Sequence, residues 1–176
     1  MGRSAWNARR VALTGILSAE AIALSALEMM IPPVPFLPPG AKPGFSNIVT
    51  MFAAQEFGFS SALPVALIKS LFVLVTRGPS AFLMSVSGGL LSTVVMCLCF
   101  RFNRRALGII GISVLSSVAH NLGQLGAACL LTGTVSLYTY LPVLTLFAIV
   151  MGIITGVLLA AILPALEKQK KHLISQ

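Results

Sequence analysis

The chain alternates between long apolar segments and short polar ones, and most apolar segments are nearly long enough to cross a bilayer. A transmembrane helix needs about 20 predominantly apolar residues. Helices are predicted at residues 11–31, 44–57, 60–76, 80–100, 107–131 and 141–163. The pattern therefore predicts an all-α integral membrane protein, a six-helix transmembrane bundle that forms a single multi-pass domain over residues 1–176.

A proline-rich segment, PPVPFLPPGAKP, follows the first predicted helix at residues 32–43 and holds six of the ten prolines. Proline fixes φ and lacks an amide donor, so the segment is expected to be a stiff extended loop on the outer side. The helix predicted next, at residues 44–57, would rise only about 21 Å. We therefore expect the loop to dip into the outer half of the protein and complete that crossing.

Positive charge is sorted along the chain, because nine of the 12 Lys and Arg residues form three short clusters. The clusters are Arg3, Arg9 and Arg10, then Arg101, Arg104 and Arg105, then Lys168, Lys170 and Lys171. An even number of predicted helices separates consecutive clusters, so all three lie on one side of the membrane. Positively charged loops remain cytoplasmic, which predicts that both termini are cytoplasmic.

The composition excludes an ordinary soluble domain. Hydrophobic residues make up 57% of the chain, charged residues 9%, and the mean hydropathy is +0.97, whereas soluble domains carry about 25% charged residues. The formal charge of +8 would suggest a nucleic-acid partner in a soluble protein. Here the topology rule explains the basic clusters, so the expected surroundings are the lipid bilayer and no nucleic acid.

Three ionisable residues fall inside predicted helices: Glu20, Lys69 and His120. Such groups cost about 2.5 to 3.5 kcal/mol each in the hydrocarbon region, so they usually face a bundle interior or a cavity. Helix rise places Glu20 and Lys69 about 14 Å deep and His120 about 20 Å deep. They could meet near mid-membrane, either as a structural Glu20–Lys69 charge pair or in a transport role.

A second polar set lies in the predicted outer half: Glu28, Lys42, Asn47, Arg77, Asn121 and Gln124. Lys42 and Arg77 break the positive-inside pattern. Two cations on the outer side suggest an anionic ligand that enters from outside, because Lys and Arg bind phosphate and carboxylate groups. The alternative is interfacial anchoring, in which the side chains reach lipid headgroups.

The segment AHNLGQLG places His120 and Gln124 on one helix face, where they could bind a ligand or join helices. The predicted substrate-binding residues are Lys42, Asn47, Arg77, His120, Asn121 and Gln124. No metal site is expected, because His120 has no neighbouring Cys or Asp set. No cofactor is predicted either.

Small residues recur at positions where helices could approach closely. Gly15, Ala19 and Ala23 are spaced four apart in the first predicted helix. The pairs predicted to pack inside the bundle are Gly88 with Gly89 and Gly152 with Gly156.

Three segments together resemble a known family: GAKPGFSNIVTMFA at residues 40–53, SGGLLSTVVM at 87–96 and GISVLSSVAHNLGQL at 111–125. They resemble the Gx transporter family, whose members are often labelled heptaprenyl diphosphate synthase component I. These proteins are similar to the substrate-binding S components of energy-coupling factor (ECF) transporters. The resemblance covers most of the chain and implies a multi-pass protein of the bacterial plasma membrane.

The resemblance implies that Lys42, Asn47, His120, Asn121 and Gln124 form an outward-facing binding site. It also implies that the stripe Gly15, Ala19 and Ala23 packs against a coupling subunit with its ATPases. Pro43 departs from the aliphatic residue expected after the lysine.

Three functions remain open at the level of sequence. An ECF-like S component would bind a small anionic or amphipathic solute, such as an isoprenoid or quinone precursor or a flavin-like molecule. Energy would come from partner ATPases or from an ion gradient, since the sequence has no GxxxxGK[ST] loop.

The alternative is a membrane accessory subunit of a polyprenyl diphosphate synthase. An enzyme is not expected, because a sequence without Asp lacks the motifs that hold Mg²⁺ on diphosphates. The third candidate function is that of a membrane scaffold that binds no solute.

Overall fold

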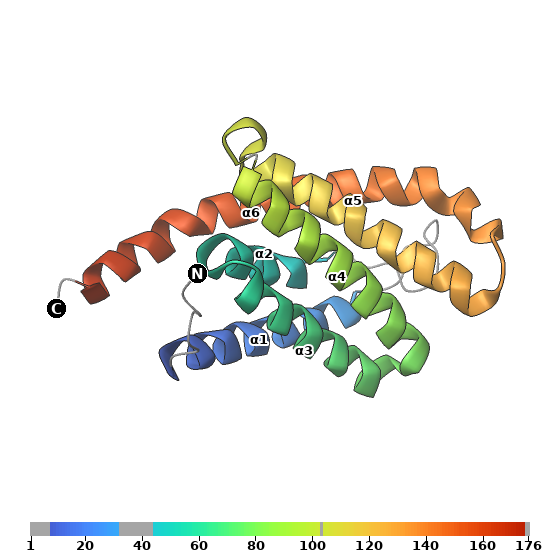
Figure 1. Ribbon diagram of the computed structural model, residues 1–176, viewed down its shortest axis with the longest axis horizontal. Coiled ribbons are helices and arrows are strands. Elements are labelled where there is room, and N and C mark those ends of the chain that lie inside the picture. Colours follow the sequence, from blue (N-terminus) through green and yellow to red (C-terminus); the bar gives the residue numbers. More distant parts are fainter. Residues whose placement is uncertain (1–7, 32–43, 103, 175–176) are drawn as a thin grey trace.

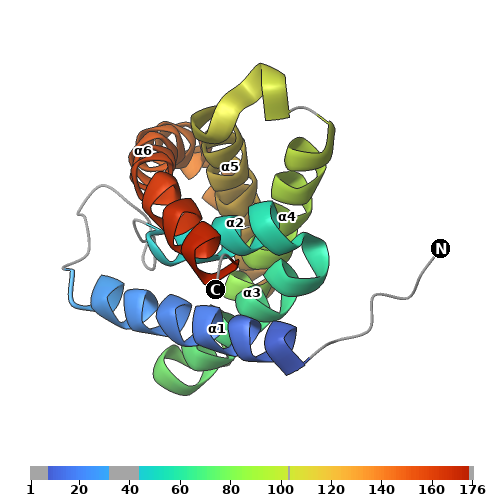
Figure 2. The same ribbon diagram turned by 90° about the vertical axis from the view of Figure 1, so that its left-hand side faces the viewer.

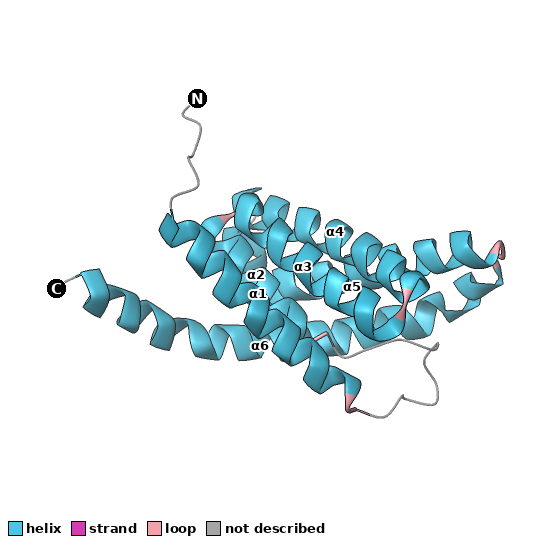
Figure 3. Ribbon diagram, turned by 90° about the horizontal axis from the view of Figure 1, so that it is seen from below, coloured by secondary structure: helices cyan, strands magenta, loops and turns pink. Residues whose placement is uncertain are grey.

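The computed structural model of the protein describes residues 8–31, 44–102 and 104–174, with side chains up to residue 164. These residues form α1 (Ala8–Met29), α2 (Ser46–Phe57), α3 (Phe59–Arg77), α4 (Pro79–Phe102), α5 (Arg104–Thr132), the 3-10 helix η1 (Ser136–Tyr140) and α6 (Leu141–Ile174). The described parts contain no strand (Figure 3). The predicted all-α bundle is therefore confirmed, and each predicted helix has an observed counterpart.

Five of the helices are long and apolar enough to cross a membrane, and α2 is the exception. With 12 residues, α2 rises only about 18 Å. The predicted proline-rich loop that would complete this crossing lies outside the described residues. Large apolar side chains such as Val75 and Leu130 are 85% and 86% exposed, as expected where a helix faces lipid. The molecule is a multi-pass membrane protein.

The helix boundaries differ from the prediction by up to three residues, except at the end of α6, where the difference is larger. Helix α6 continues to Ile174, well past residue 163, because the polar end of the chain is rich in Glu, Gln, Lys and Leu, which have high helix propensity. Helix α5 begins at Arg104 and changes direction at Gly108, whose φ is 62° and ψ is −179°. Only glycine adopts such a backbone conformation readily. Apolar patterning predicted the apolar parts of these helices but did not predict their polar ends.

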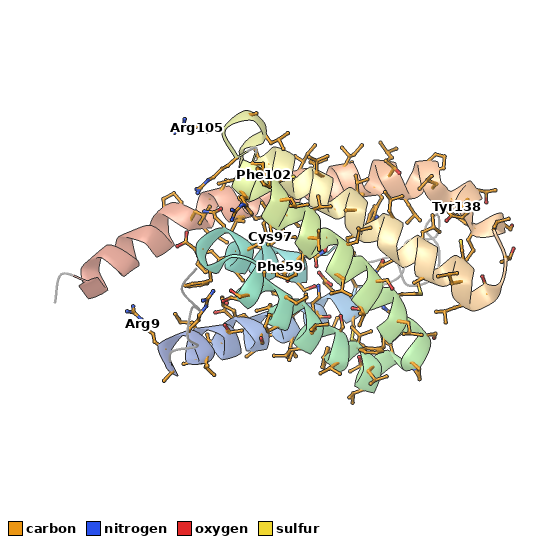
Figure 4. The ribbon with its side chains drawn as sticks, in the orientation of Figure 1. Arg9, Phe59, Cys97, Phe102, Arg105 and Tyr138 are labelled. Carbon is orange, nitrogen blue, oxygen red and sulfur yellow. The ribbon has the colours of Figure 1, made fainter. Side chains whose placement is uncertain are left out.

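The helices run back and forth along the long axis of the molecule (Figure 1). Figure 4 shows Arg9 of α1 and Arg105 of α5 toward one end of the bundle and Tyr138 of η1 at the other. Arg10 also marks the first end, because its guanidinium donates to the Phe57 carbonyl at 2.8 Å and to Ser61 Oγ at 3.1 Å, at the corner between α2 and α3. This arrangement suits the predicted even number of crossings. The side that faces the cytoplasm stays a prediction.

Glycine residues allow α4, α5 and α6 to pack closely. A Cβ on Gly88 of α4 would lie 2.7 Å from the His120 carbonyl of α5, and a Cβ on Gly123 would lie 2.7 Å from the Ser87 carbonyl. A Cβ on Gly152 of α6 would lie 2.6 Å from Val114 Cα of α5. These contacts confirm that Gly88 and Gly152 pack within the bundle, as small residues do at membrane helix interfaces.

Hydroxyl pairs also join neighbouring helices. Ser70 Oγ of α3 lies 3.0 Å from Ser85 Oγ of α4, and Ser113 Oγ of α5 lies 2.9 Å from Thr155 Oγ1 of α6. All four residues are buried. Such hydrogen bonds stabilise helix contacts in an apolar environment, where polar groups need partners. Seen end-on, α2 and α4 lie between α1 and α3 on one side and α5 and α6 on the other (Figure 2).

Candidate binding site

A cavity of about 300 Å³ lies among the helices, toward the end that carries the α3–α4 turn. Its described lining is Ser25, Glu28, Gly44, Ser46, Asn47, Lys69, Val73, Arg77, Ser80, Ala81, Met84, Ser85, Ser117, His120, Asn121, Gln124, Ala148 and Met151. Every α-helix contributes at least one lining residue. The cavity is therefore a property of the whole bundle.

Helix α3 supplies the cationic wall. Lys69, Val73 and Arg77 are spaced four apart, so they share one helix face, and all three line the cavity. Lys69 is only 4% exposed and its Nζ donates to Asn47 Oδ1 on α2 at 2.6 Å. Arg77 is exposed in the last turn of α3, about 12 Å further along the helix axis. One cation thus lies inside the cavity and the other near its rim.

Glu28 and Ser46 connect α1 to the beginning of α2. The Glu28 carboxylate is 4% exposed and accepts hydrogen bonds from the Ser46 amide at 2.9 Å and from Ser46 Oγ at 3.4 Å. A carboxylate at a helix N-terminus satisfies a free amide and interacts favourably with the helix dipole. The buried acid therefore fixes the first turn of α2 at the edge of the cavity.

Helix α5 supplies a wall of His120, Asn121 and Gln124. The His120 Nδ1 lies 3.4 Å from Ser92 Oγ of α4. Asn121 Nδ2 donates to the Leu144 carbonyl of α6 at 3.2 Å. Two of these residues are thus oriented by neighbouring helices, and Asn121 still has an amide oxygen that can accept a hydrogen bond.

The cavity unites most of the residues that the sequence singled out. Asn47, Arg77, His120, Asn121 and Gln124 all line it, and Lys42 lies outside the described residues. Their role in binding a substrate stays a prediction, because no ligand contact tests it. The geometry shows that these residues, from the three helices α2, α3 and α5, share one cavity.

The structure does not bring Glu20 and Lys69 together. The buried face of α1 carries Ser18, Ala21, Ser25 and Glu28. Glu20 lies two residues beyond Ser18, about 200° around the helix, and its side chain is exposed. Depth along the helix axis suggested a charge pair, but the rotation of α1 places Glu20 on its outer face, while Lys69 lines the cavity.

Sequence reasoning did not assign several cavity residues. Glu28 and Lys69 are charged residues within helices, but neither belongs to the predicted binding site. The unassigned hydroxyl and thioether groups belong to Ser25, Ser46, Ser80, Ser85, Ser117, Met84 and Met151. The spacing of Ser25 and Glu28, three apart on one helix face, was the available signal for α1. Serines elsewhere in apolar helices gave no signal that separates cavity lining from helix packing.

The small-residue stripe Gly15, Ala19 and Ala23 lies on the outside of α1, where all three residues are exposed. A Cβ added to Gly15 would meet no atom within 4 Å. The stripe is therefore accessible on this chain, unlike the glycines of α4 and α6. Its predicted contact with a coupling subunit stays a prediction.

Comparisons with known proteins agree with this fold. A family model described as heptaprenyl diphosphate synthase component I matches residues 17–162. One solved structure, described as "Structure and mechanism of the S component of a bacterial ECF transporter", matches with a TM-score of 0.58 and 21% sequence identity, and the match covers 96% of this chain and 98% of that chain. No curated protein matches the chain. At this identity, the structural match establishes a shared fold.

Proposed function

Because the chain belongs to the heptaprenyl diphosphate synthase component I family, and because its fold is that of an ECF S component, we propose that it is a membrane transport protein. It acts as the substrate-binding S component of an ECF-like importer in the bacterial plasma membrane. The single observation that carries this proposal is the polar cavity enclosed by all six α-helices, which contains the residues predicted to bind a solute.

The charges of the cavity support an anionic or amphipathic solute. Lys69 and Arg77 provide two cations on the α3 wall, and the Glu28 carboxylate accepts hydrogen bonds from Ser46. Arg suits phosphate and carboxylate groups, which its planar donors can bind in pairs. Lys69 is buried in an environment of low dielectric constant, where its attraction for an anion is stronger than in water.

Energy for uptake comes from a partner in this proposal. The sequence contains no GxxxxGK[ST] loop, the loop that binds nucleotide phosphates in many ATPases. The exposed face formed by Gly15, Ala19 and Ala23 on α1 is the proposed contact with the coupling subunit. Small residues there allow a helix of the partner to approach closely.

Purification of the tagged protein from its native membrane in mild detergent tests the proposal. Mass spectrometry should identify a coupling subunit and its ATPases, together with any bound solute. Uptake of that solute by cells should require this protein and the ATPases. Recovery of the protein without ATPases, in cells whose uptake does not depend on them, would contradict the proposal.

The family description favours a second candidate, a membrane accessory subunit of a prenyl diphosphate synthase. A sequence without Asp lacks the Asp-rich motifs that hold Mg²⁺ on diphosphates. A soluble partner would therefore perform catalysis. The same purification separates the two candidates. A soluble prenyltransferase in place of the ATPases would favour the accessory subunit, and Arg77 would then be tested for diphosphate binding.

A further inference from the structure

We infer that the cavity binds a compact, hydroxylated anion, and that it disfavours long prenyl chains and flat aromatic ring systems. The inference rests on the proposed function, because it names the class of solute that the same site takes. Three independent properties of the described lining lead to it: the volume of the cavity, the chemistry of its walls, and the hydrogen-bonding groups left open within it.

The volume sets the size of the solute. The cavity measures about 300 Å³, and each water molecule in the liquid occupies about 30 Å³. The space corresponds to about ten water molecules and lies at the small end of the range for small-molecule pockets, about 300 to 1,000 Å³. A polyprenyl diphosphate is much larger than this. A short acid or a phosphate ester that carries a few hydroxyl groups fits.

The walls are more polar than those of a usual small-molecule pocket. Twelve of the 18 lining residues have polar side chains, and the apolar ones are Val73, Ala81, Met84, Ala148 and Met151 besides Gly44. No Phe, Tyr or Trp is among the described lining residues. Pockets for drug-sized apolar ligands are lined mainly by hydrophobic and aromatic side chains. The lining therefore disfavours an isoprenoid chain or a flat aromatic ring system.

Several polar groups in the lining have no partner within the described part of the chain. The side chains of Ser25, Ser117 and Gln124 form no hydrogen bond there, and all three line the cavity. A polar group that loses its hydrogen-bond partners on burial is destabilising. An apolar solute would displace water and leave these groups unpaired, whereas the hydroxyl groups of a solute would satisfy them.

The walls also give the solute a direction. The cations Lys69 and Arg77 lie on α3, and the amides Asn121 and Gln124 lie on α5. Helix α4 packs against both α3 and α5, so the two sets lie on separate walls with α4 between them. The anionic group of the solute therefore faces α3, and its hydroxylated part faces α5.

Equilibrium binding of four probes to the full-length protein in lipid nanodiscs tests this inference. Glycerol 3-phosphate and n-butyl phosphate share a head group and have similar sizes, so they isolate the effect of the hydroxyl groups. Dodecyl phosphate tests chain length, and riboflavin tests a large ring system. Glycerol 3-phosphate should bind at least about tenfold more tightly than each of the other three, since two hydrogen bonds are worth about that factor.

Two variants test whether the preference for glycerol 3-phosphate depends on residues of the cavity. Gln124→Met keeps the volume of the side chain and removes its hydrogen bonds, so it should weaken glycerol 3-phosphate binding severalfold and leave n-butyl phosphate binding unchanged. Lys69→Met should weaken both phosphates, because both lose the cation. A preference for glycerol 3-phosphate that is unaffected by Gln124→Met would overturn the assignment of the hydroxyl-binding wall.

The results that would overturn this inference differ from the results that would overturn the proposed function. Tighter binding of dodecyl phosphate or riboflavin, abolished by Lys69→Met, would overturn the solute class and leave a solute-binding transport subunit. Failure of all four probes to bind would also overturn the solute class. The transport role itself fails only if the purified protein lacks coupling ATPases as well.

Discussion

The two cations of the α3 wall differ in their exposure to solvent. Arg77 lies in the last turn of α3 near the rim, and Lys69 lies inside, where its ammonium group donates to Asn47. A charge at the rim of a site mainly attracts the ligand from a distance, whereas a buried partner mainly retains it. The two residues should therefore control different rate constants for the same anion.

We expect Arg77→Gln to lower the association rate constant of glycerol 3-phosphate about tenfold at low salt, and to have little effect at high salt, where exposed charges are screened. Lys69→Met should raise the dissociation rate constant at least about tenfold. Stopped-flow binding in nanodiscs measures both constants. Arg104→Gln, at the far end of the bundle, is the control. If both cavity variants changed only dissociation, the rim role of Arg77 would be wrong.

Lys42→Ala and His120→Ala should each weaken solute uptake without lowering the amount of protein in the membrane. His120 lines the cavity, and the sequence resemblance implies that Lys42, which lies outside the described residues, belongs to the same site. Uptake assays paired with quantitative immunoblots of membranes provide the measurement. Unchanged uptake in both variants would contradict the proposed site.

At the scale of elements, the approach of α4 to α5 positions the α5 wall. A Cβ on Gly88 would lie 2.7 Å from both Gln124 Cγ and the His120 carbonyl. The carbonyl belongs to the helix backbone and cannot move by a rotamer change. The neighbouring Gly89 faces more space, since its nearest atoms would be 3.8 and 3.9 Å away. Adjacent glycines thus have different structural roles.

We expect Gly88→Ala to destabilise the protein by about 1 to 3 kcal/mol, the usual cost of overpacking, and to weaken glycerol 3-phosphate binding by displacing His120 and Gln124. Gly89→Ala is the matched control and should be neutral or slightly stabilising, because alanine favours helix. Thermal unfolding in detergent and probe binding measure the two effects. Equal destabilisation by both substitutions would show that the Gly88 contact does not limit the approach of α4.

Hydropathy predicted the helices well, because membrane-spanning segments must be apolar and helical. It could not predict the rotation of each helix about its axis. Glu20 and Lys69 have similar depths along their axes, yet Glu20 is exposed on α1 and Lys69 lines the cavity. In a membrane helix, lipid-facing and buried faces are both apolar, so the pattern carries little information on rotation. The role of Glu28 likewise depends on Ser46, a contact that the sequence does not show.

At the scale of the molecule, a cavity inside the bundle and a small-residue stripe outside it occupy different faces of α1. Gly15, Ala19 and Ala23 are exposed, whereas Ser25 and Glu28 line the cavity. A substitution on the outer face can therefore change the contact with a partner without changing the lining of the cavity. This separation makes the two proposed roles of α1 independently testable.

We expect Ala19→Leu to reduce copurification of the coupling subunit at least about tenfold, because a larger side chain prevents close helix approach. Probe binding by the isolated protein should stay unchanged. Ala161→Leu, which makes the same change at an exposed position on α6, is the control. Quantitative mass spectrometry of the purified complexes gives the measurement. Normal copurification of the Ala19→Leu protein would rule out the α1 face as the contact.

Helix α1 holds α2 at both of its ends. Glu28 accepts the Ser46 amide at the beginning of α2, and Arg10 donates to the Phe57 carbonyl at its end. Asn47, the partner of the Lys69 ammonium, follows Ser46 directly. Both ends of α2 are therefore attached to α1 by hydrogen bonds, and a displacement of α1 would act on Asn47 through Ser46. Mechanical work done on the surface of α1 would in this way alter the electrostatic potential that a solute experiences at Lys69.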